Sequence, residues 1–181
     1  MDNNKKRLSI AVDMDGVLAD TQTHFISYYE KETGEKIQPE SMLGIPESEA
    51  FPDKTAVQRF VRQPGFFRTL PLIPGGVEAL RTLMRDFDVY IASAAMEFPL
   101  SLYEKKQWLE EHFPFISWEN IVFCGDKRII RTDYLIDDHL RNLDSFQGTP
   151  ILFTASHNVH YTHHKRANNW QEILQYFKQV V

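Results

Sequence analysis

The sequence predicts an α/β fold in which a mostly parallel, doubly wound sheet carries a small helical insertion after its first strand. Two observations support this prediction. Short apolar runs of strand length alternate with helical patterns over most of the chain, an order that is typical of parallel sheets. Between residues 36 and 74, by contrast, no strand pattern occurs, and six prolines separate short helical pieces.

The part of the chain before residue 75 divides into a strand, a helix and the proline-rich insertion. Residues 8–12 form the first apolar run, and Gly16 permits a sharp exit after it. Residues 21–32 have a helical pattern that ends near Gly34. Within the insertion, the segment most typical of a helix spans residues 54–62.

The rest of the chain alternates between helices and strands. A helix over residues 77–85 precedes a strand over residues 88–92, and another helix follows over residues 101–113. The spacing of Ser101 and Glu104 suggests a capping box at the start of that helix. Three further apolar runs and a terminal helix span residues 121–123, 135–136, 151–153 and 170–180. Five strands interleaved with helices indicate parallel pairing.

Length and composition favour a single domain. With 181 residues and 43% hydrophobic content, the chain can bury one substantial core. Its formal net charge of -5 gives no overall basic field to attract a nucleic-acid polymer or an anionic membrane. Cys124 is the only cysteine and no signal-peptide or membrane-spanning pattern occurs, so we expect a cytoplasmic location. The oligomeric state is left open, and a homodimer is compatible with the sequence.

Two carboxylates stand at the end of the first predicted strand. Asp13 and Asp15 follow the aliphatic run and precede Gly16. Ligands of parallel α/β sheets bind at the carboxyl ends of the strands, and two like charges held close together need a counter-ion or a proton. We expect Mg²⁺ as that counter-ion, because this cation prefers hard oxygen ligands.

Three later strand ends also carry groups suited to phosphate chemistry. Ser93 follows the second strand, Lys127 follows the third, and Asp137 and Asp138 follow the fourth. Because the carboxyl ends of parallel strands meet at one edge, these side chains are expected to converge with the first pair. One carboxylate can then attack phosphorus, a second can transfer a proton and a third can hold a metal, while serine and lysine bind phosphoryl oxygens.

Three other groups have simpler interpretations. Phe66 and Phe67 are interpreted first as core packing, with stacking against a substrate base as the alternative. Glu47 and Glu49 are interpreted as solvated surface. Four histidines lie close together near the C-terminus: His157, His160, His163 and His164. No cysteine or acidic residue stands at ligand spacing from them, so an exposed polar loop is preferred over a metal site.

The order of the aspartate, serine, lysine and paired-aspartate motifs resembles the haloacid-dehalogenase superfamily of aspartate-nucleophile phosphotransferases. Further segments resemble the 5'(3')-deoxyribonucleotidase family in their order and spacing. These segments are residues 12–20, 64–67, 103–108, 126–127, 135–138 and 151–158. The resemblance therefore extends from near the N-terminus to the last helix.

The resemblance implies a Rossmann-like catalytic core, typical of the haloacid-dehalogenase superfamily, formed by residues 1–20 and 73–181. Residues 21–72 would form a small helical cap. The implied reaction is hydrolysis of (deoxy)ribonucleoside 5'- or 3'-monophosphates, preferably deoxy, to nucleoside and phosphate. It proceeds through an aspartyl-phosphate intermediate with Mg²⁺ as the cofactor.

The resemblance also implies roles for the four aspartates. Asp13 is the nucleophile, and Asp15 is the general acid and later the general base. Asp13 contacts Mg²⁺ directly, Asp15 reaches the ion through its backbone carbonyl, and Asp138 is the remaining direct metal ligand. Asp137 supports the metal ligand Asp138 from outside the set of residues that contact the metal, and it orients Lys127.

Phosphate and substrate binding are assigned by the same resemblance. The phosphate-binding residues are Ser93, Ala94 and Lys127, and the substrate-binding residues are Thr21, Phe66, Phe67 and His139. The chain departs from the family pattern in three places: members usually carry an aromatic residue at Thr21, threonine-serine-proline at residues 93–95, and arginine or lysine at His139. We expect these departures to affect the substrate range.

Two other functions use the same predicted residues. The catalytic groups would also serve a phosphatase for another small phosphomonoester such as a sugar phosphate, because residues of the cap choose the substrate. A catalytically silent domain that binds a phosphate ligand is the alternative from another class, although every catalytic position is filled.

Overall fold

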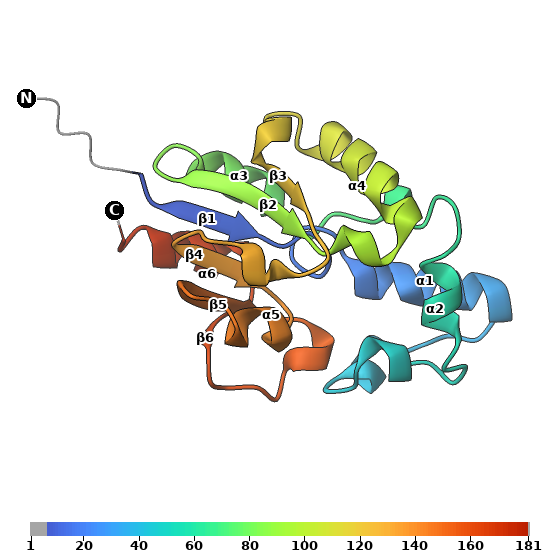
Figure 1. The fold of residues 1–181 in the computed structure, drawn as a ribbon. Coiled ribbons are helices and arrows are strands. Elements are labelled where there is room, and N and C mark those ends of the chain that lie inside the picture. The colour runs from blue at the N-terminus through green and yellow to red at the C-terminus, as the bar shows by residue number, and fades with distance from the viewer. Residues whose placement is uncertain (1–6, 181) are drawn as a thin grey trace, which may run out of the picture.

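The centre of the fold is a single sheet whose strands all run parallel. A computed structural model describes residues 7–180. The strands, in the order β3-β2-β1-β4-β5-β6 across the sheet, are β1 (Ser9–Val12), β2 (Asp88–Ser93), β3 (Ile121–Phe123), β4 (Tyr134–Asp137), β5 (Thr149–Phe153) and β6 (Lys165–Ala167) (Figure 1). This order confirms the doubly wound sheet. Residues 1–6 and Val181 of the expected core lie outside the described residues.

Helices connect these strands. The α-helices are α1 (Thr21–Thr33), α2 (Ala56–Phe60), α3 (Gly76–Leu83), α4 (Pro99–His112), α5 (Leu140–Asp144) and α6 (Trp170–Phe177). The 3₁₀ helices are η1 (Pro39–Met42), η2 (Glu47–Glu49), η3 (Phe67–Thr69), η4 (Ala95–Glu97), η5 (Trp118–Asn120), η6 (Lys127–Ile129) and η7 (Ser156–Asn158).

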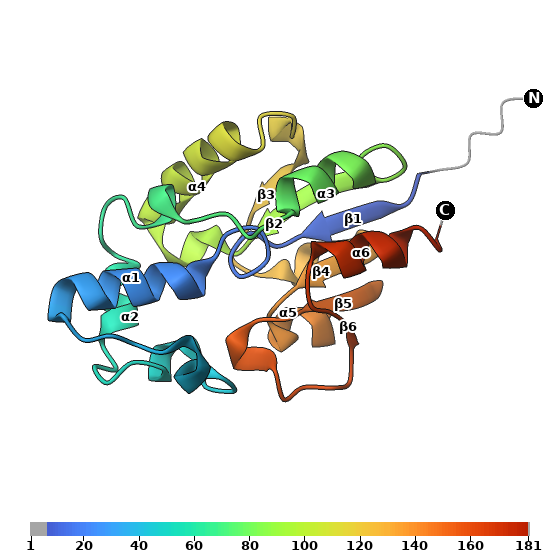
Figure 2. The same cartoon turned by 180° about the vertical axis from the view of Figure 1, so that it is seen from behind.

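The two faces of the sheet bury different cores because successive strand residues point to opposite sides. Ile10 and Val12 of β1 pack into the larger core, which also receives apolar residues of α3, α4 and α6. Ala11 faces a smaller core that includes Leu143 of α5. Figures 1 and 2 show α3 and α6 together on one face and α5 on the other. The sheet is therefore covered on both sides, as its apolar strands require.

The register brings several strand ends to one edge. Val12 of β1 is level with Ile91 of β2 on one side and with Ile136 of β4 on the other. Asp13, which directly follows β1, and Asp137, the last residue of β4, therefore lie at the same edge of the sheet. The functional residues expected at the strand ends are brought together by this alignment.

Residues 21–72 contain only helices and irregular segments among the elements described, and they lie beyond the carboxyl edge of the sheet (Figure 1). α1 begins where the Asp20 carboxylate accepts a hydrogen bond from Thr23 N at 2.9 Å. It ends at Gly34, which adopts the left-handed conformation with φ 77°. The helix therefore ends where the sequence predicts.

The chain segment that returns from these helices to the sheet is attached to α4. The Glu104 carboxylate accepts hydrogen bonds from Gly65 N at 2.6 Å and Phe67 N at 3.0 Å. One turn later, Trp108 Nε1 donates to Leu70 O at 2.7 Å. Buried backbone groups need such partners, so α4 fixes the position of this segment relative to the sheet.

Two local predictions are wrong. The capping box at Ser101 and Glu104 does not form, because α4 begins earlier, at Pro99, and the Ser101 hydroxyl donates to Ala95 O at 2.7 Å. A sixth strand, β6, was not predicted. It contains Lys165 and Arg166, and as an edge strand with one buried residue it lacks an apolar pattern.

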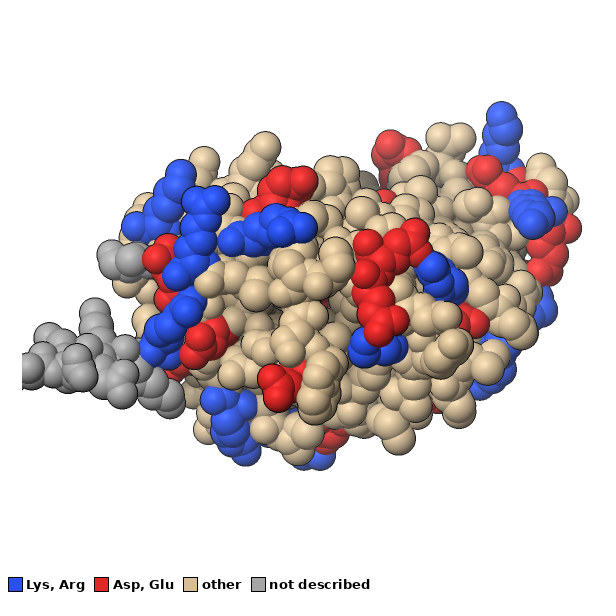
Figure 3. Space-filling view, turned by 90° about the horizontal axis from the view of Figure 1, so that it is seen from above, with Lys and Arg blue, Asp and Glu red and all other residues tan. Residues whose placement is uncertain are grey.

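The surface of the molecule carries charges of both signs. On the face shown in Figure 3, acidic and basic side chains are mixed and separated by uncharged areas. Among residues 7–180, no helix combines the length and apolar composition needed to cross a bilayer.

We predict that Glu104→Ala lowers the free energy of unfolding by about 2 kcal/mol, because it leaves two backbone donors without an acceptor. Glu110→Ala is the matched control on the same helix: that side chain is 62% exposed and is paired with Lys106, so its loss changes stability by less than about 0.5 kcal/mol. Urea unfolding of both variants provides the measurement. Equal losses would contradict the proposed anchoring by Glu104.

Candidate active site

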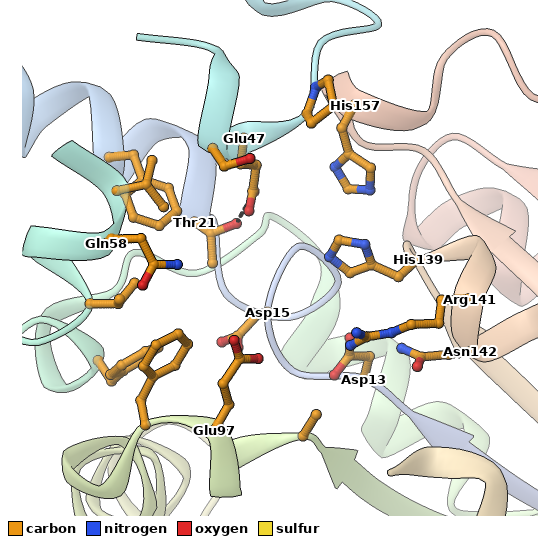
Figure 4. A pocket seen from close by; sticks show the side chains of 18 of the residues that line it. Asp13, Asp15, Thr21, Glu47, Gln58, Glu97, His139, Arg141, Asn142 and His157 are labelled. Carbon is orange, nitrogen blue, oxygen red and sulfur yellow. Dashed lines mark hydrogen bonds between the residues drawn. The ribbon is translucent and has the colours of Figure 1, made fainter. Parts of the chain in front are cut away.

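A pocket of about 640 Å³ opens where the strand ends face residues 21–72. Asp13 and Asp15 lie on its floor, and Thr21 and Glu47 lie across from them (Figure 4). The pocket volume is within the range typical of small-molecule sites. Of the side chains expected at the strand ends, Asp13, Asp15 and Lys127 line this cavity.

Asp13 is held with one carboxylate oxygen engaged and the other available. Its Oδ1 accepts hydrogen bonds from Met14 N at 2.7 Å and lies 2.6 Å from Lys127 Nζ. Burial raises the pKa of Asp13 to about 6, with Lys127 opposing the rise and Asp137 and Asp15 adding to it. Both described contacts are made by Oδ1, which leaves Oδ2 as the oxygen available to a ligand in the pocket.

Lys127 neutralises part of the acidic cluster at the pocket floor. It is only 3% exposed, and its Nζ lies 2.6 Å from both Asp13 Oδ1 and Asp137 Oδ2. Burial alone would lower the pKa of Lys127, but the two carboxylates raise it above its ordinary value. The lysine therefore remains charged, because its two carboxylate partners stabilise the cation in the buried site.

Asp137 has both carboxylate oxygens engaged. Besides Lys127, it accepts hydrogen bonds from His139 N at 2.9 Å and from Asn142 Nδ2 at 3.0 and 3.1 Å. The side chain is fully buried. This arrangement suits a residue that orients Lys127.

Asp138 has the features of a cation ligand. Its Oδ1 is buried and has no hydrogen-bond partner among the described residues. Carboxylate oxygens of Asp13, Asp137 and Asp138 lie within 4.8 Å of one another, and burial raises the pKa of Asp138 well above its usual value. An unpartnered buried carboxylate beside other carboxylates is costly without a cation or a proton. These oxygens therefore fit a hard divalent cation such as Mg²⁺.

Gly16 makes room for that carboxylate. With φ 71° it adopts a conformation that side chains rarely take, and a Cβ at this position would lie 2.1 Å from Asp138 Oδ2. The backbone of Asp138 is fixed from the other side, where its carbonyl accepts hydrogen bonds from Asn158 Nδ2 at 2.9 Å. The position of Asp138 is thus set by a glycine and a buried amide.

Lys105 of α4 is a site residue that sequence reasoning missed. Its buried Nζ donates to Ser93 Oγ at 2.9 Å, forms an ion pair with Asp15 Oδ2, and lies 4.8 Å from the centre of the Phe67 ring. Its segment, residues 103–108, carried part of the family resemblance, but no local pattern separates this lysine from the lysine next to it, Lys106. Only the packing of α4 against the strand ends shows that it enters the pocket.

The far wall of the pocket contains two residues whose expected exposure is wrong. Glu47, interpreted as solvated surface, lines the pocket and accepts a hydrogen bond from Thr21 Oγ1 at 3.3 Å (Figure 4). Burial raises its pKa, with the charge of His139 opposing the rise. His157, assigned to an exposed loop, stacks on His139 with ring centres 4.5 Å apart, and burial lowers its pKa to about 4. Tertiary contacts rather than local composition remove both side chains partly from solvent.

An apolar wall completes the pocket. It is formed by Phe25, Val57, Val61, Phe66, Phe67 and Phe98. Phe66 is fully buried and Phe67 is 4% exposed, and their rings meet edge to face at 5.1 Å. Both residues therefore pack in the core and also contribute to the pocket wall, so the two sequence interpretations are not exclusive.

Comparison with known proteins identifies the family. The family model described as "5' nucleotidase, deoxy (Pyrimidine), cytosolic type C protein" matches residues 6–180. The chain belongs to this nucleotidase family. The family and the enzyme class expected from the sequence are therefore confirmed.

Relatives cover nearly the whole nucleotidase chain. A Bacillus subtilis protein described as a 5'(3')-deoxyribonucleotidase is 37% identical over 164 residues, which span 91% of this chain and 95% of that protein. A Staphylococcus aureus (strain Mu50) protein with a provisional description of the same activity is 43% identical over 172 residues, spanning 94% and 96% of the two chains.

Solved structures confirm the fold. A haloacid dehalogenase-like hydrolase from Streptococcus pneumoniae superposes with a TM-score of 0.61 at 17% identity, covering 94% of the nucleotidase and 98% of that chain. The D,D-heptose 1,7-bisphosphate phosphatase from B. bronchiseptica, solved with magnesium and phosphate, gives 0.58 at 13% identity, covering 96% and 99%. At such identities the likeness concerns the fold alone.

The remaining residues predicted to bind phosphate or substrate differ in whether they line the pocket. Ala94, Thr21 and His139 line the pocket, whereas Ser93 is 1% exposed and lies behind Lys105. Arg141, which was not predicted, also lines the pocket two residues after His139. It supplies a basic side chain close to where the family pattern has arginine or lysine.

We predict that Asp13 destabilises the metal-free protein as pH rises. The folded-state pKa of Asp13 is about 6 against an ordinary 3.8, so the folded state binds more protons than the unfolded chain between these values. Stability from this group is therefore present at low pH and is lost as pH approaches about 6. Urea unfolding in EDTA, compared between wild type and Asp13→Asn, measures the effect.

The comparison with Asp13→Asn isolates this carboxyl, because histidines such as His157, whose lowered pKa acts in the opposite direction, titrate in both proteins. The free energy of unfolding of wild type minus that of the variant should fall between pH of about 4 and about 6. A difference that rises across this window would show that Asp13 is not held as described.

Proposed function

We propose that this nucleotidase hydrolyses (deoxy)ribonucleoside 5'- or 3'-monophosphates to nucleoside and phosphate through an aspartyl-phosphate on Asp13. The observation that carries the proposal is the Asp13 carboxylate on the pocket floor, with Oδ1 fixed by Met14 N and Lys127 and Oδ2 left for the substrate. The description of the Bacillus subtilis relative supports the nucleotide substrate.

The carboxylates on the pocket floor supply the cofactor site in this proposal. The carboxylates of Asp13 and Asp138, together with the backbone carbonyl of Asp15, would hold Mg²⁺, which neutralises the charge of the substrate phosphate and of the carboxylates around it. The unpartnered Asp138 Oδ1 supports this assignment. Asp137 remains behind these residues because both its oxygens are already engaged.

The first half of the reaction transfers the phosphoryl group to the enzyme. An oxygen of Asp13 forms a bond to phosphorus while the bond from phosphorus to the ester oxygen breaks. Asp15 donates its proton to that departing oxygen, which leaves as the nucleoside hydroxyl. Asp15 is suited to this step because its Oδ1 has no hydrogen-bond partner among the described residues while Oδ2 is paired with Lys105.

The second half regenerates the carboxylate. A water molecule attacks the phosphorus of the aspartyl-phosphate, Asp15 accepts the proton, and the bond from phosphorus to Asp13 breaks to release inorganic phosphate. Lys127 and Lys105 both line the pocket, where they compensate the negative charge of the transferred group. Ser93 acts through Lys105, and Ala94 borders the same space.

Residues 21–72 form the cap that chooses the substrate in this proposal. They contribute Phe25, Val57, Phe66 and Phe67 to an apolar wall, and a planar base would pack against its aromatic rings. Glu47 and Thr21 add polar groups from the same segment. A base on the apolar wall and a phosphate on the carboxylate floor would account for a monophosphate substrate.

We predict that Asp13→Asn abolishes phosphate release while the fold is retained. Removing the nucleophile costs several orders of magnitude in kcat, as for other covalent catalysts. The assay compares phosphate release from dUMP, dTMP, UMP and glucose 6-phosphate with Mg²⁺, and repeats it in EDTA, where turnover should also stop. Thermal unfolding of Asp13→Asn with trifluoroberyllate serves as a check, since wild type alone should be stabilised.

Each outcome of the substrate panel decides between the candidate functions. Turnover of nucleotides that is lost in Asp13→Asn supports the proposal. Turnover of glucose 6-phosphate alone would support a sugar-phosphate phosphatase on the same catalytic residues. Absence of turnover with every substrate would indicate a silent phosphate-binding domain.

We predict that Gly16→Ala weakens Mg²⁺ binding by at least about tenfold, because the added methyl group displaces the Asp138 carboxylate. Gly125→Ala is the matched control, since a Cβ there would approach no atom closer than 3.9 Å. Calorimetric titration with Mg²⁺ measures both variants without substrate. Equal affinities would show that Asp138 does not hold the ion.

A further inference from the structure

Two histidines and an aspartate converge at a point outside the nucleotide pocket. His163 and His164 lie in the loop between η7 and β6, and Asp144 is the last residue of α5. The Nε2 atoms of His163 and His164 lie 3.2 and 2.7 Å from the same oxygen, Asp144 Oδ1. Side chains 19 and 20 residues apart thus meet although no sequence spacing indicates it, and none of the three lines the pocket.

We propose that Asp144, His163 and His164 form a binding site for a divalent first-row transition-metal ion such as Zn²⁺. Two imidazole nitrogens and one carboxylate oxygen are a donor set that Zn²⁺ accepts readily and that Mg²⁺, which requires oxygen ligands, does not. The site therefore differs in chemistry from the all-carboxylate floor of the pocket. It is independent of the proposed nucleotidase reaction.

The distances between the ligand atoms are close to those of a zinc site. Bonds of about 2.0–2.2 Å place neighbouring ligand atoms of a tetrahedral centre about 3.3 Å apart. The two nitrogens lie 3.2 and 2.7 Å from Asp144 Oδ1, and the three ligand atoms all lie within 4.8 Å of one another. Small side-chain rotations are sufficient to admit an ion, and solvent can complete its coordination because His163 and Asp144 are about half exposed.

The charge of Asp144 favours cation binding near neutral pH. Hydrogen bonds from His164 and His163 lower the pKa of Asp144, so its carboxylate is charged. A neutral imidazole carries one proton and one lone pair, and moving the proton to Nδ1 presents the Nε2 lone pair to the ion. The metal thus replaces the hydrogen bonds that hold the three side chains together.

The bound ion would join two elements that form the pocket wall. α5 carries Arg141 and Asn142 to the pocket, the loop that ends at His164 carries Tyr161, and η7 directly before this loop carries His157. Without a metal, the hydrogen bonds from His163 and His164 to Asp144 connect the loop to α5. A metal at this position would hold the wall more firmly than these partly exposed hydrogen bonds.

The test is calorimetric titration of the full chain with ZnCl₂ in the presence of excess Mg²⁺. We expect one Zn²⁺ binding event in wild type and a loss of affinity of at least about tenfold in His163→Gln and in His164→Gln. His160→Gln is the matched control, because His160 is an exposed histidine of the same loop that is not one of the three proposed ligands. The Zn²⁺ affinity of this variant should equal that of wild type. Visible absorption of added Co²⁺ reports coordination independently and should disappear in the same two variants.

Two further variants, Asp138→Asn and Asp144→Asn, test where the ion binds. Asp138→Asn removes a carboxylate of the acidic cluster next to Asp13, and Zn²⁺ binding that is lost only in this variant would place the ion there and overturn the proposal. Wild type that binds no Zn²⁺ would also overturn it. Asp144→Asn should repeat the loss seen for the histidines, and equal melting temperatures without metal show that the variants are folded. Phosphate release is not a readout, so failure of the nucleotidase proposal would leave this result unaffected.

Discussion

The buried ion pairs of Lys127 allow several carboxylates to lie close together in the pocket. Four carboxylates, those of Asp13, Asp15, Asp137 and Asp138, gather at one edge of the sheet, and three of them are almost fully buried. Lys127 compensates two of these charges directly, at 2.6 Å from Asp13 and from Asp137. Because burial removes the solvent that would stabilise anions, the cluster depends on this cation and on the cation that Asp138 is suited to bind. The raised pKa values of Asp13 and Asp138 show that the compensation is incomplete without a ligand.

The helix α4 connects the helical segment to this cluster. Glu104 holds the backbone at Gly65 and Phe67, while the next residue, Lys105, pairs with Asp15 and Ser93. Successive residues of one helix turn therefore contact the segment that carries the apolar wall and the carboxylate floor of the pocket. A displacement of α4 would move both together, which gives the molecule a physical link between the position of residues 21–72 and the placement of Asp15.

The fold was predicted largely because its signals are local. Apolar runs, a left-handed glycine after α1 and polar strand ends indicate the alternation of strands and helices, and the parallel arrangement follows from their order. β6 was missed because an edge strand with Lys165 and Arg166 buries too little to need an apolar pattern. The capping box failed for a similar reason: Ser101 and Glu104 have the right spacing, but tertiary partners take both side chains.

The sequence by itself determined the strand-end motifs: two aspartates after β1, a lysine after β3 and a pair of aspartates at the end of β4, which parallel strands must bring to one edge. Only the tertiary structure decided which other side chains join them. Lys105 and Glu47 resemble surface residues in their local sequence, and His163 and His164 acquire an acidic partner only where α5 meets their loop. The physical reason is that strand polarity and periodicity are encoded locally, whereas burial and the convergence of side chains depend on which segments distant in the chain pack together.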